Sequence, residues 1–209
     1  MVGESKLPMR QGSPDDFQAP KEAIDVLLPY LDKSKTIWEP ACGKRNIVNA
    51  FEEKGYKVIA TDIKDVPHTD RIDFLELDKN LQGYSFSFHD LYGYIVTNPP
   101  YSKKELFLER CYNLGKPFAL LMPLTALESE KLLPLFREFG IQLIIPNKRY
   151  NFETPTGKGK GAWFATAWFT WGLNLPKDLN FVDVKKSKYY LGVDYAEEGS
   201  ESLSFSGKT

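Results

Sequence analysis

The sequence predicts an α/β domain with an open, mostly parallel sheet that helices cover on both faces. Short apolar runs alternate with segments in which apolar residues recur at helical spacing, an order typical of β-α-β units. Gly55, Gly115 and Gly140 stand at the ends of the clearest helical segments, where glycine commonly ends a helix. The last two long apolar runs have no helix between them, so we expect them to pair antiparallel at one edge of the sheet.

The N-terminal half is expected to hold two helices and three strands. Pro20 suits the first position of a helix that continues to Leu31, because proline is tolerated where no backbone donor is needed. A strand over 36–38 and a helix over 47–54 follow, and the helix ends at a glycine. Strands are predicted over 57–61 and 94–97, with an irregular stretch between them.

The C-terminal half continues the alternation. The segment 102–115 begins with the Ser-x-x-Glu spacing of a capping box and predicts a helix. A strand over 118–122, a helix over 132–139 and a strand over 141–145 follow. The last strand, 162–171, is rich in aromatic residues, and its alternation favours core packing over base stacking.

Length and composition suit one domain that is large enough to bury a full hydrophobic core. We expect a flexible N-terminus over 1–13, a single domain over 14–195 and a disordered tail over 196–209. With two cysteines, no Cys-x-x-Cys pair and two histidines, the chain is not expected to carry disulfides or a metal site. Neither a signal peptide nor a membrane span is expected, so the prediction is a cytoplasmic protein. The net charge of −1 does not by itself indicate a nucleic-acid partner.

The turn Asn98-Pro99-Pro100-Tyr101 is the most informative motif in the chain. It directly follows the expected strand 94–97, and the segments Glu39–Gly43 and Asp62 follow two other expected strands in the same way. Ligands of open α/β sheets bind beyond the carboxyl ends of the strands, so these three signals point to one cleft. Taken alone, Asp62 is also compatible with a helix cap, and Glu39–Gly43 with an ordinary tight turn.

Together these motifs resemble the S-adenosylmethionine-dependent methyltransferases of the adenine-N6 type, in the compact form seen in phages and mobile elements. The resemblance covers about Asp16 to Trp171. It implies a three-layer Rossmann-like methyltransferase fold, with a mostly parallel seven-stranded sheet and one antiparallel edge hairpin. Its catalytic turn implies the following roles: Asn98 and Pro99 accept the hydrogens of the target amine, Pro100 stiffens the turn, and Tyr101 stacks on the target base.

The resemblance also implies a site for S-adenosylmethionine, with no metal. Small residues in Glu39–Gly43 would let the backbone approach the methionine part, and Asp62, 19 positions after Gly43, would accept from the ribose hydroxyls. The complete implied set of cofactor-binding residues is Phe17, Gln18, Pro20, Glu39, Pro40, Ala41, Cys42, Gly43, Asp62, Ile63, Asp73, Phe74 and Asn98. Arg45 stands where the family has a small residue, and a bulky cation there is expected to hinder the cofactor.

The expected substrate is nucleic acid, with DNA favoured, and a monomer is the favoured state. A basic loop over 147–161 is the candidate phosphate contact. The residues predicted to contact nucleic acid are Tyr101, Lys103, Lys148, Arg149, Lys158 and Lys160. Two alternatives remain open: methylation of RNA (adenine N6 or guanine N2) or of a protein glutamine, and a catalytically inactive binding protein that kept the fold, for which Arg45 is the main support.

Overall fold

A computed structural model describes residues 15, 17–77, 88–154, 157–158 and 164–184. The expected flexible N-terminus (1–13) and tail (196–209) lie outside this range, so those two expectations stay predictions. The described residues form one eight-stranded sheet in the order β10-β6-β9-β5-β4-β1-β2-β3. A separate two-stranded sheet pairs β7 with β8. The predicted three-layer α/β fold class is confirmed.

The main sheet is parallel except at β9, which runs antiparallel to both β5 and β6. Its strands are β1 (Ile37–Glu39), β2 (Val58–Asp62), β3 (Asp70–Arg71), β4 (Tyr94–Thr97), β5 (Phe118–Pro123), β6 (Gln142–Pro146), β9 (Thr166–Trp171) and β10 (Leu179–Val182). The small sheet consists of β7 (Glu153–Thr154) and β8 (Gly157–Lys158).

Two details of the predicted sheet differ from the structure. The sheet has eight strands rather than seven, and the antiparallel strand β9 lies between β5 and β6 rather than at the edge. The edge is β10, a four-residue strand that pairs parallel with β6. Its short sequence, Leu-Asn-Phe-Val, carries a weak strand signal, and the Asn180 carboxamide is needed to bond the Leu143 and Lys177 carbonyls.

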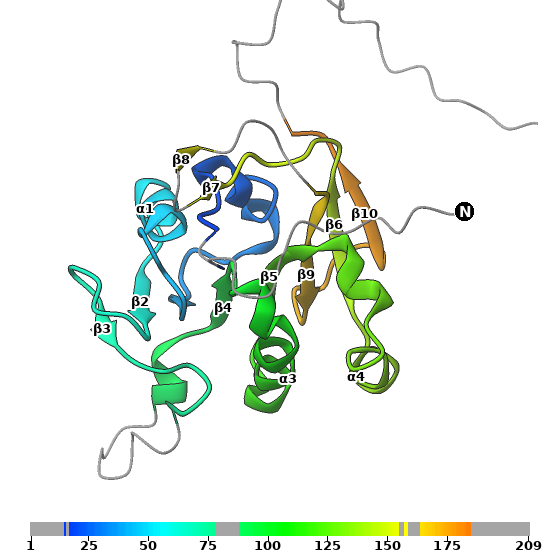
Figure 1. Cartoon of the computed structure of the whole chain (residues 1–209), viewed down its shortest axis with the longest axis horizontal. Helices are drawn as coiled ribbons and strands as arrows, with labels where there is room; N and C mark the ends of the chain where they lie inside the picture. Colours follow the sequence, from blue (N-terminus) through cyan, green and yellow to red (C-terminus); the bar gives the residue numbers. More distant parts are fainter. Residues whose placement is uncertain (1–14, 16, 78–87, 155–156, 159–163, 185–209) are drawn as a thin grey trace, which may run out of the picture.

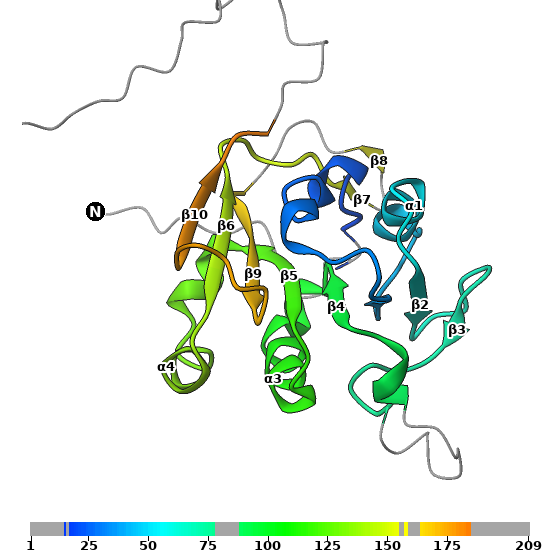
Figure 2. The same ribbon diagram turned by 180° about the vertical axis from the view of Figure 1, so that it is seen from behind.

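Helices cover both faces of the sheet. The α-helices are α1 (Asn46–Glu53), α3 (Lys104–Leu114) and α4 (Leu133–Phe139), and 3-10 turns span Lys21–Ile24, Leu28–Tyr30, Phe88–Leu91, Tyr101–Lys103 and Leu124–Glu128. Figure 1 shows α1 and the N-terminal 3-10 turns on one side of the sheet and α3 and α4 on the other, and Figure 2 shows the same layers from behind. Among the described residues, no helix is long and apolar enough to cross a membrane.

The first predicted helix is replaced by two short 3-10 turns. The expected helix ran from Pro20 to Leu31, whereas the structure breaks it between Ile24 and Leu28. Pro29 lies inside the expected helix and has no N–H to donate to the preceding turn, so a continuous α-helix is disfavoured there. Of the apolar residues at helical spacing, Ala23, Ile24, Leu27 and Leu31 are still buried and Leu28 is partly buried.

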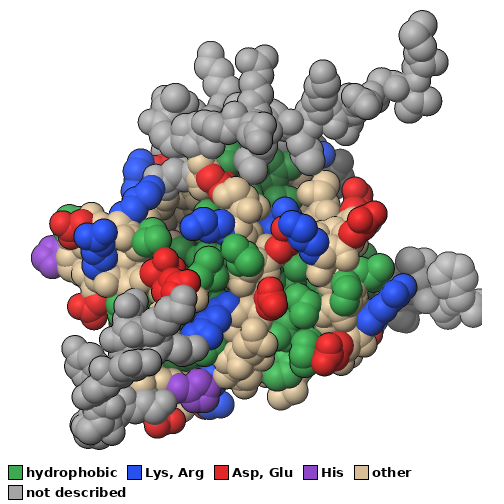
Figure 3. Space-filling model, turned by 60° about the horizontal axis from the view of Figure 1, so that its bottom comes forward, with side chains coloured by type: hydrophobic (Ala, Val, Ile, Leu, Met, Phe, Trp, Pro, Cys, Tyr) green, Lys and Arg blue, Asp and Glu red, His purple; other side chains and the backbone are tan. Residues whose placement is uncertain are grey.

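Two hydrophobic clusters lie on the two faces of the sheet. One packs beneath α1 and contains Trp168, and the other packs beneath α3 and α4 and contains Trp38; both tryptophans are fully buried. Figure 3 views the α3 and α4 side, where hydrophobic, basic and acidic side chains are interspersed. The burial of Trp168 confirms that the aromatic strand β9 is a core strand.

The indole of Trp168 donates a hydrogen bond to the buried Ala23 carbonyl at 2.8 Å and so ties β9 to the N-terminal segment. We expect Trp168→Phe to lower the free energy of unfolding by about 1–3 kcal/mol, because it leaves that carbonyl without a partner. The matched control is Trp171→Phe, since the Trp171 indole donates to the Phe139 carbonyl at an exposed position. Urea unfolding measures both, and equal losses would contradict the assigned role.

Candidate active site

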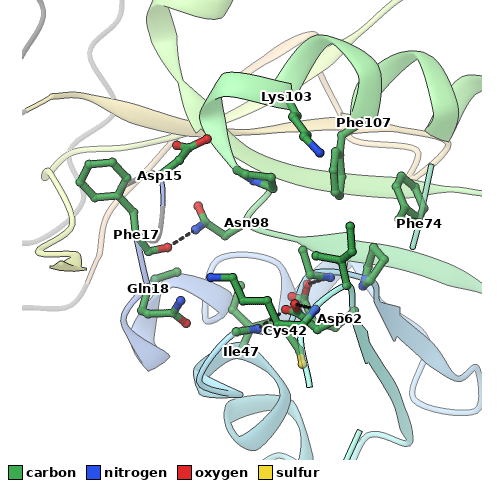
Figure 4. Close-up of a pocket in the computed structure, with 18 of the residues that line it drawn as sticks. Asp15, Phe17, Gln18, Cys42, Ile47, Asp62, Phe74, Asn98, Lys103 and Phe107 are labelled. Atoms are coloured by element: carbon green, nitrogen blue, oxygen red, sulfur yellow. Dashed lines mark hydrogen bonds between the residues drawn. The ribbon is translucent and has the colours of Figure 1, made fainter. Parts of the chain in front are cut away.

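A cavity of about 510 Å³ opens at the carboxyl ends of β1, β2 and β4 (Figure 4). Of the residues predicted to bind a cofactor, all except Pro20 line it. The residues of the cavity wall that the sequence prediction missed are Asp15, Ala19, Asn46, Ile47, Lys64, Leu75, Ser102 and Phe107. Ile47 and Phe107 belong to the apolar faces of α1 and α3. Their helical spacing predicts that they are buried, but it does not predict that they line a cavity.

Asp62 braces the loop that follows β1. Its Oδ2 accepts from the Gly43 N–H at 2.9 Å, and its Oδ1 accepts from the Lys64 N–H at 2.8 Å. The carboxylate is buried and lines the cavity. Asp62 therefore fixes the position of the glycine turn whether or not it also meets a ligand.

Both the backbone conformation at position 43 and the close approach of Gln18 require glycine there. Gly43 adopts a left-handed conformation with φ of 49°, and a Cβ there would lie 2.5 Å from the carboxamide of Gln18. The same carboxamide accepts from the Lys44 N–H at 2.8 Å. The small residue thus lets the N-terminal segment lie directly against the loop after β1.

Glu39 is the most deeply buried acid of the cavity, with 1% of its surface exposed. Its Oε1 accepts from the Ala41 N–H at 3.1 Å, while Oε2 has no hydrogen bond of normal geometry among the described residues. Burial raises the pKa of Glu39, hydrogen bonds from Thr97 and the Ala41 N–H lower it, and the nearby charge of Asp62 raises it. The net effect is a pKa of about 8. Oε2 is itself enclosed by protein, so a cation in the cavity would meet the charge of the carboxyl rather than an open oxygen.

The other end of the cavity is aromatic. The rings of Phe74 and Phe107 stack with centroids 4.8 Å apart, and Trp38 meets Phe74 edge-on at 5.2 Å. Ile63, 49% exposed, lies among the lining residues, and Asp73 uses its Oδ1 to accept from the Leu75 N–H. An apolar wall with carboxylates beside it suits a flat heteroaromatic ring that carries donor groups.

The Asn98 carboxamide is held at both of its polar atoms. Its Nδ2 donates to the Phe17 carbonyl at 2.7 Å, and its Oδ1 accepts from the Tyr101 hydroxyl at 3.0 Å. These bonds orient Oδ1 as an acceptor with one remaining lone pair. In Figure 4, Asn98 lies between the Phe17 side and the Cys42 and Asp62 side of the cavity.

The ring of Tyr101 does not line the cavity in this structure. It is 3% exposed and packs in a four-ring cluster with Phe17, Phe152 and Phe164. Phe17 stacks on it at 5.7 Å with 21° between the planes, whereas the other two rings meet it edge-on. Burial raises the pKa of Tyr101 well above its usual value, which keeps the hydroxyl a donor to Asn98.

Asp15 holds the end of the Asn98–Tyr101 turn and was not predicted. Its two carboxylate oxygens accept from the Tyr101 N–H at 3.0 Å and the Ser102 N–H at 2.7 Å. The predicted capping box is absent: the Ser102 N–H is used by Asp15, and Glu105 accepts from the Ser129 hydroxyl. The partner lies 87 residues away in sequence, a separation that no local capping rule detects.

Arg45 is directed away from the cavity. It adopts a left-handed conformation with φ of 63°, and its guanidinium donates to the His68 carbonyl at 2.7 Å and pairs with Glu52. Arg45 is not among the lining residues. The expected steric hindrance by this side chain is therefore not found in the structure.

The predicted nucleic-acid contacts fall into three groups. Lys103 lines the cavity, whereas Lys148 and Arg149 lie outside its lining. For Lys158 the structure describes the backbone in β8, and Lys160 lies outside the described residues. Within the described ranges, no group of three or more His, Cys, Asp or Glu side chains could hold a metal ion.

We expect Asp15→Ala to lower the free energy of unfolding by about 1 kcal/mol, as loss of a helix N-cap does. Hydrogen exchange at the Tyr101 and Ser102 amides should speed up, because both lose their acceptor. The control is Asp25→Ala, which removes only an exposed pair with Lys54 at 3.7 Å, a loss of about 0.5 kcal/mol or less. Unchanged exchange at these two amides would contradict the role of Asp15.

Neither a family model nor a curated protein matches this chain in sequence. Its structure is similar to that of a Vibrio vulnificus YJ016 protein described as a modification subunit of a type I restriction enzyme, with a TM-score of 0.52, 14% identity and 83% of this chain covered. The chain spans about half (48%) of that protein.

Weaker similarity extends to two further methyltransferases. One is a SAM-dependent methyltransferase from Archaeoglobus fulgidus, with a TM-score of 0.46, 13% identity, and coverage of 72% of this chain and 91% of that one. The other is the 1,6-didemethyltoxoflavin-N1-methyltransferase of Burkholderia thailandensis, with a TM-score of 0.42, 11% identity, and coverage of 72% and 75%. The sheet order and the similarity to the Vibrio protein show that the chain has a Rossmann-like α/β fold.

Proposed function

We propose that this protein transfers a methyl group from S-adenosylmethionine to the exocyclic N6 amine of adenine in nucleic acid, with DNA as the favoured substrate. One observation carries the proposal: the Asn98–Tyr101 turn follows β4 at the edge of the acid-lined cavity. There Asn98 presents an oriented carboxamide oxygen between that cavity and an aromatic cluster. This arrangement puts a site for a methyl donor beside a site for a flat base.

The cavity residues fit S-adenosylmethionine. The charge of the Glu39 carboxyl in the cavity wall would suit the ammonium of the methionine part. The Phe74 and Phe107 side suits the adenine ring, and Asp62 stands where ribose hydroxyls would be bound. When bound, this cofactor supplies an electrophilic methyl group on a sulfonium centre.

The residues of the turn would activate the target amine. The lone pair of an exocyclic adenine amine is conjugated into the ring, so the amine is a poor nucleophile. The Asn98 Oδ1 and the Pro99 carbonyl would accept its two hydrogens and favour the positive charge that develops on nitrogen during transfer. The two prolines restrict the turn, and the product releases its proton to water, so no histidine or cysteine is needed.

One observation supports a nucleic-acid substrate and a second favours DNA. Lys103 adds a positive charge to the cavity mouth next to the turn, which suits a phosphate. The structurally similar Vibrio protein is described as a restriction-enzyme modification subunit. A base in a duplex would have to leave the stack to reach Asn98.

The position of Arg45 weakens the alternative of an inactive binding protein. That alternative depended on a bulky cation at the cofactor loop, and the guanidinium instead contacts His68 and Glu52 outside the cavity. RNA and protein glutamine remain outcomes that the experiment below distinguishes.

The test is methyl transfer from labelled S-adenosylmethionine to unmethylated DNA, transfer RNA, ribosomal RNA and a translation release factor. We expect label in DNA as N6-methyladenine, and we expect Asn98→Ala to reduce the rate by about 100-fold or more, as loss of a transition-state acceptor does. The matched control is Asn49→Ala, on the partly buried side of α1, outside the cavity lining.

Label in RNA or protein would keep the chemistry and change the substrate. No transfer to any substrate, combined with no measurable cofactor binding, would refute the proposed enzyme. Full activity in Asn98→Ala would refute the mechanism alone.

Cofactor affinity should depend on pH through Glu39. Its pKa of about 8 means that the carboxyl is mostly protonated at pH 7 in the empty cavity. A bound ammonium favours the carboxylate, so binding releases a proton. The association constant should then rise about tenfold per pH unit below pH 8 and fall again once the α-amino group of the ligand itself loses its proton, at about pH 8 for such a group. Calorimetry in two buffers measures the released proton.

The Glu39→Gln variant should bind the cofactor more weakly, and its affinity should lose this dependence on pH. A dependence that persists in the variant would assign the released proton to another group.

A further inference from the structure

We propose that Phe17 is the gate of the target-base site: its ring covers the face of Tyr101 that the base would use, and rotation of this side chain opens the site. The proposal rests on the proposed function. It differs from the role that the family resemblance implied for Phe17, which was to hold the methionine part of the cofactor.

Phe17 is the ring that occupies the place of a base. Its plane is 21° from that of Tyr101, with centroids 5.7 Å apart, which is a stacked arrangement. Phe152 and Phe164 meet Tyr101 at 80° and 78°, so neither lies parallel to its ring as a stacked base would. With Tyr101 3% exposed, no base can stack on it until a ring leaves, and Phe17 is the ring in the stacking position.

The backbone around Phe17 is fixed, so the gate would be the side chain alone. The Phe17 carbonyl accepts from Asn98, and Gln18 exchanges two backbone hydrogen bonds with Glu153 at 2.9 and 3.0 Å. On the other side, Asp15 is held by the Tyr101 and Ser102 amides. A rotation of the Phe17 side chain leaves all of these bonds intact and keeps Asn98 oriented.

Phe17 is also the ring of this cluster that is best placed to move. Phe17 and Phe164 are both partly exposed, but of these two only Phe17 lines the cavity, whereas Phe152 is buried. Figure 4 shows the Phe17 carbonyl bonded to Asn98 and the Phe17 ring on the side away from Cys42 and Asp62. The cluster would offer an incoming base the face of Tyr101, with two phenylalanine rings roughly perpendicular to it, a slot that suits a flat heteroaromatic ring. While Phe17 stays in place, it competes with that base.

The test is binding of the full chain to a fluorescent 20-nucleotide single strand of deoxyadenosine, in saturating S-adenosylhomocysteine. A site that is open only part of the time has an apparent affinity reduced by the open fraction. We therefore expect Phe17→Ala to lower the Kd for the oligonucleotide by about 3- to 10-fold. Phe17→Leu keeps apolar bulk without a flat ring, and we expect a smaller decrease.

Two measurements separate the gate from its alternatives. The Kd for S-adenosylhomocysteine should change less than about twofold in Phe17→Ala; a loss of about tenfold or more would show that the ring holds the cofactor and would overturn the gate. The control is Phe139→Ala, which removes a phenylalanine stacked on Tyr112 at 4.9 Å on the α4 side, and it should leave the oligonucleotide Kd unchanged.

Unchanged or weaker oligonucleotide binding by folded Phe17→Ala and Phe17→Leu would overturn the gate. If the wild-type chain still methylates adenine in that case, the proposed function survives without it. If neither the wild type nor the variants bind the oligonucleotide and no nucleic acid is methylated, both the gate and the proposed substrate are refuted.

Discussion

The hydrogen bond from the Asn98 carboxamide to the Phe17 carbonyl joins segments 81 residues apart, and the arrangement of the site depends on it. It sets which atom of Asn98 is the acceptor, and it anchors the segment that meets β7 through Gln18 and Glu153. The same segment reaches the glycine turn through the Gln18 carboxamide. The Asn98–Tyr101 turn, the loop after β1 and the β7–β8 hairpin are therefore held relative to one another by a short stretch of extended chain.

The two central carboxylates of the cavity serve different purposes because their hydrogen bonding differs. Both oxygens of Asp62 already accept backbone N–H groups, so its charge is used to hold the loop. Glu39 is buried more deeply and has one oxygen without a partner of normal geometry. A buried carboxyl in that state is costly to ionise unless a cation arrives. Asp62 thus maintains the shape of the cavity, whereas the charge of Glu39 responds to a ligand.

The strand-end motifs could be predicted from the sequence because each is local: an apolar run fixes the strand, and the polar turn that follows must lie at the sheet's edge. This placed Glu39, Asp62 and Asn98 around one cavity. The contacts of Asp15 and Phe17 could not be predicted, since their partners lie 86 and 81 residues away. Asp15 has no distinctive local pattern, and the family resemblance implied a cofactor role for Phe17 rather than these contacts. β10 was missed for a related reason: its four residues form a strand only against β6.

Arg45 shows how a departure from a family pattern can be accommodated. The position has a left-handed backbone, which costs a non-glycine residue roughly 1–2 kcal/mol, and a small residue would avoid that cost. The conformation also directs the side chain out of the cavity, where the guanidinium bonds the His68 carbonyl in the segment between β2 and β3. That segment leads directly into Asp73 and Phe74 of the cavity wall. The arginine therefore links the loop after β1 to the chain that carries the aromatic end of the cavity, a connection that glycine could not make.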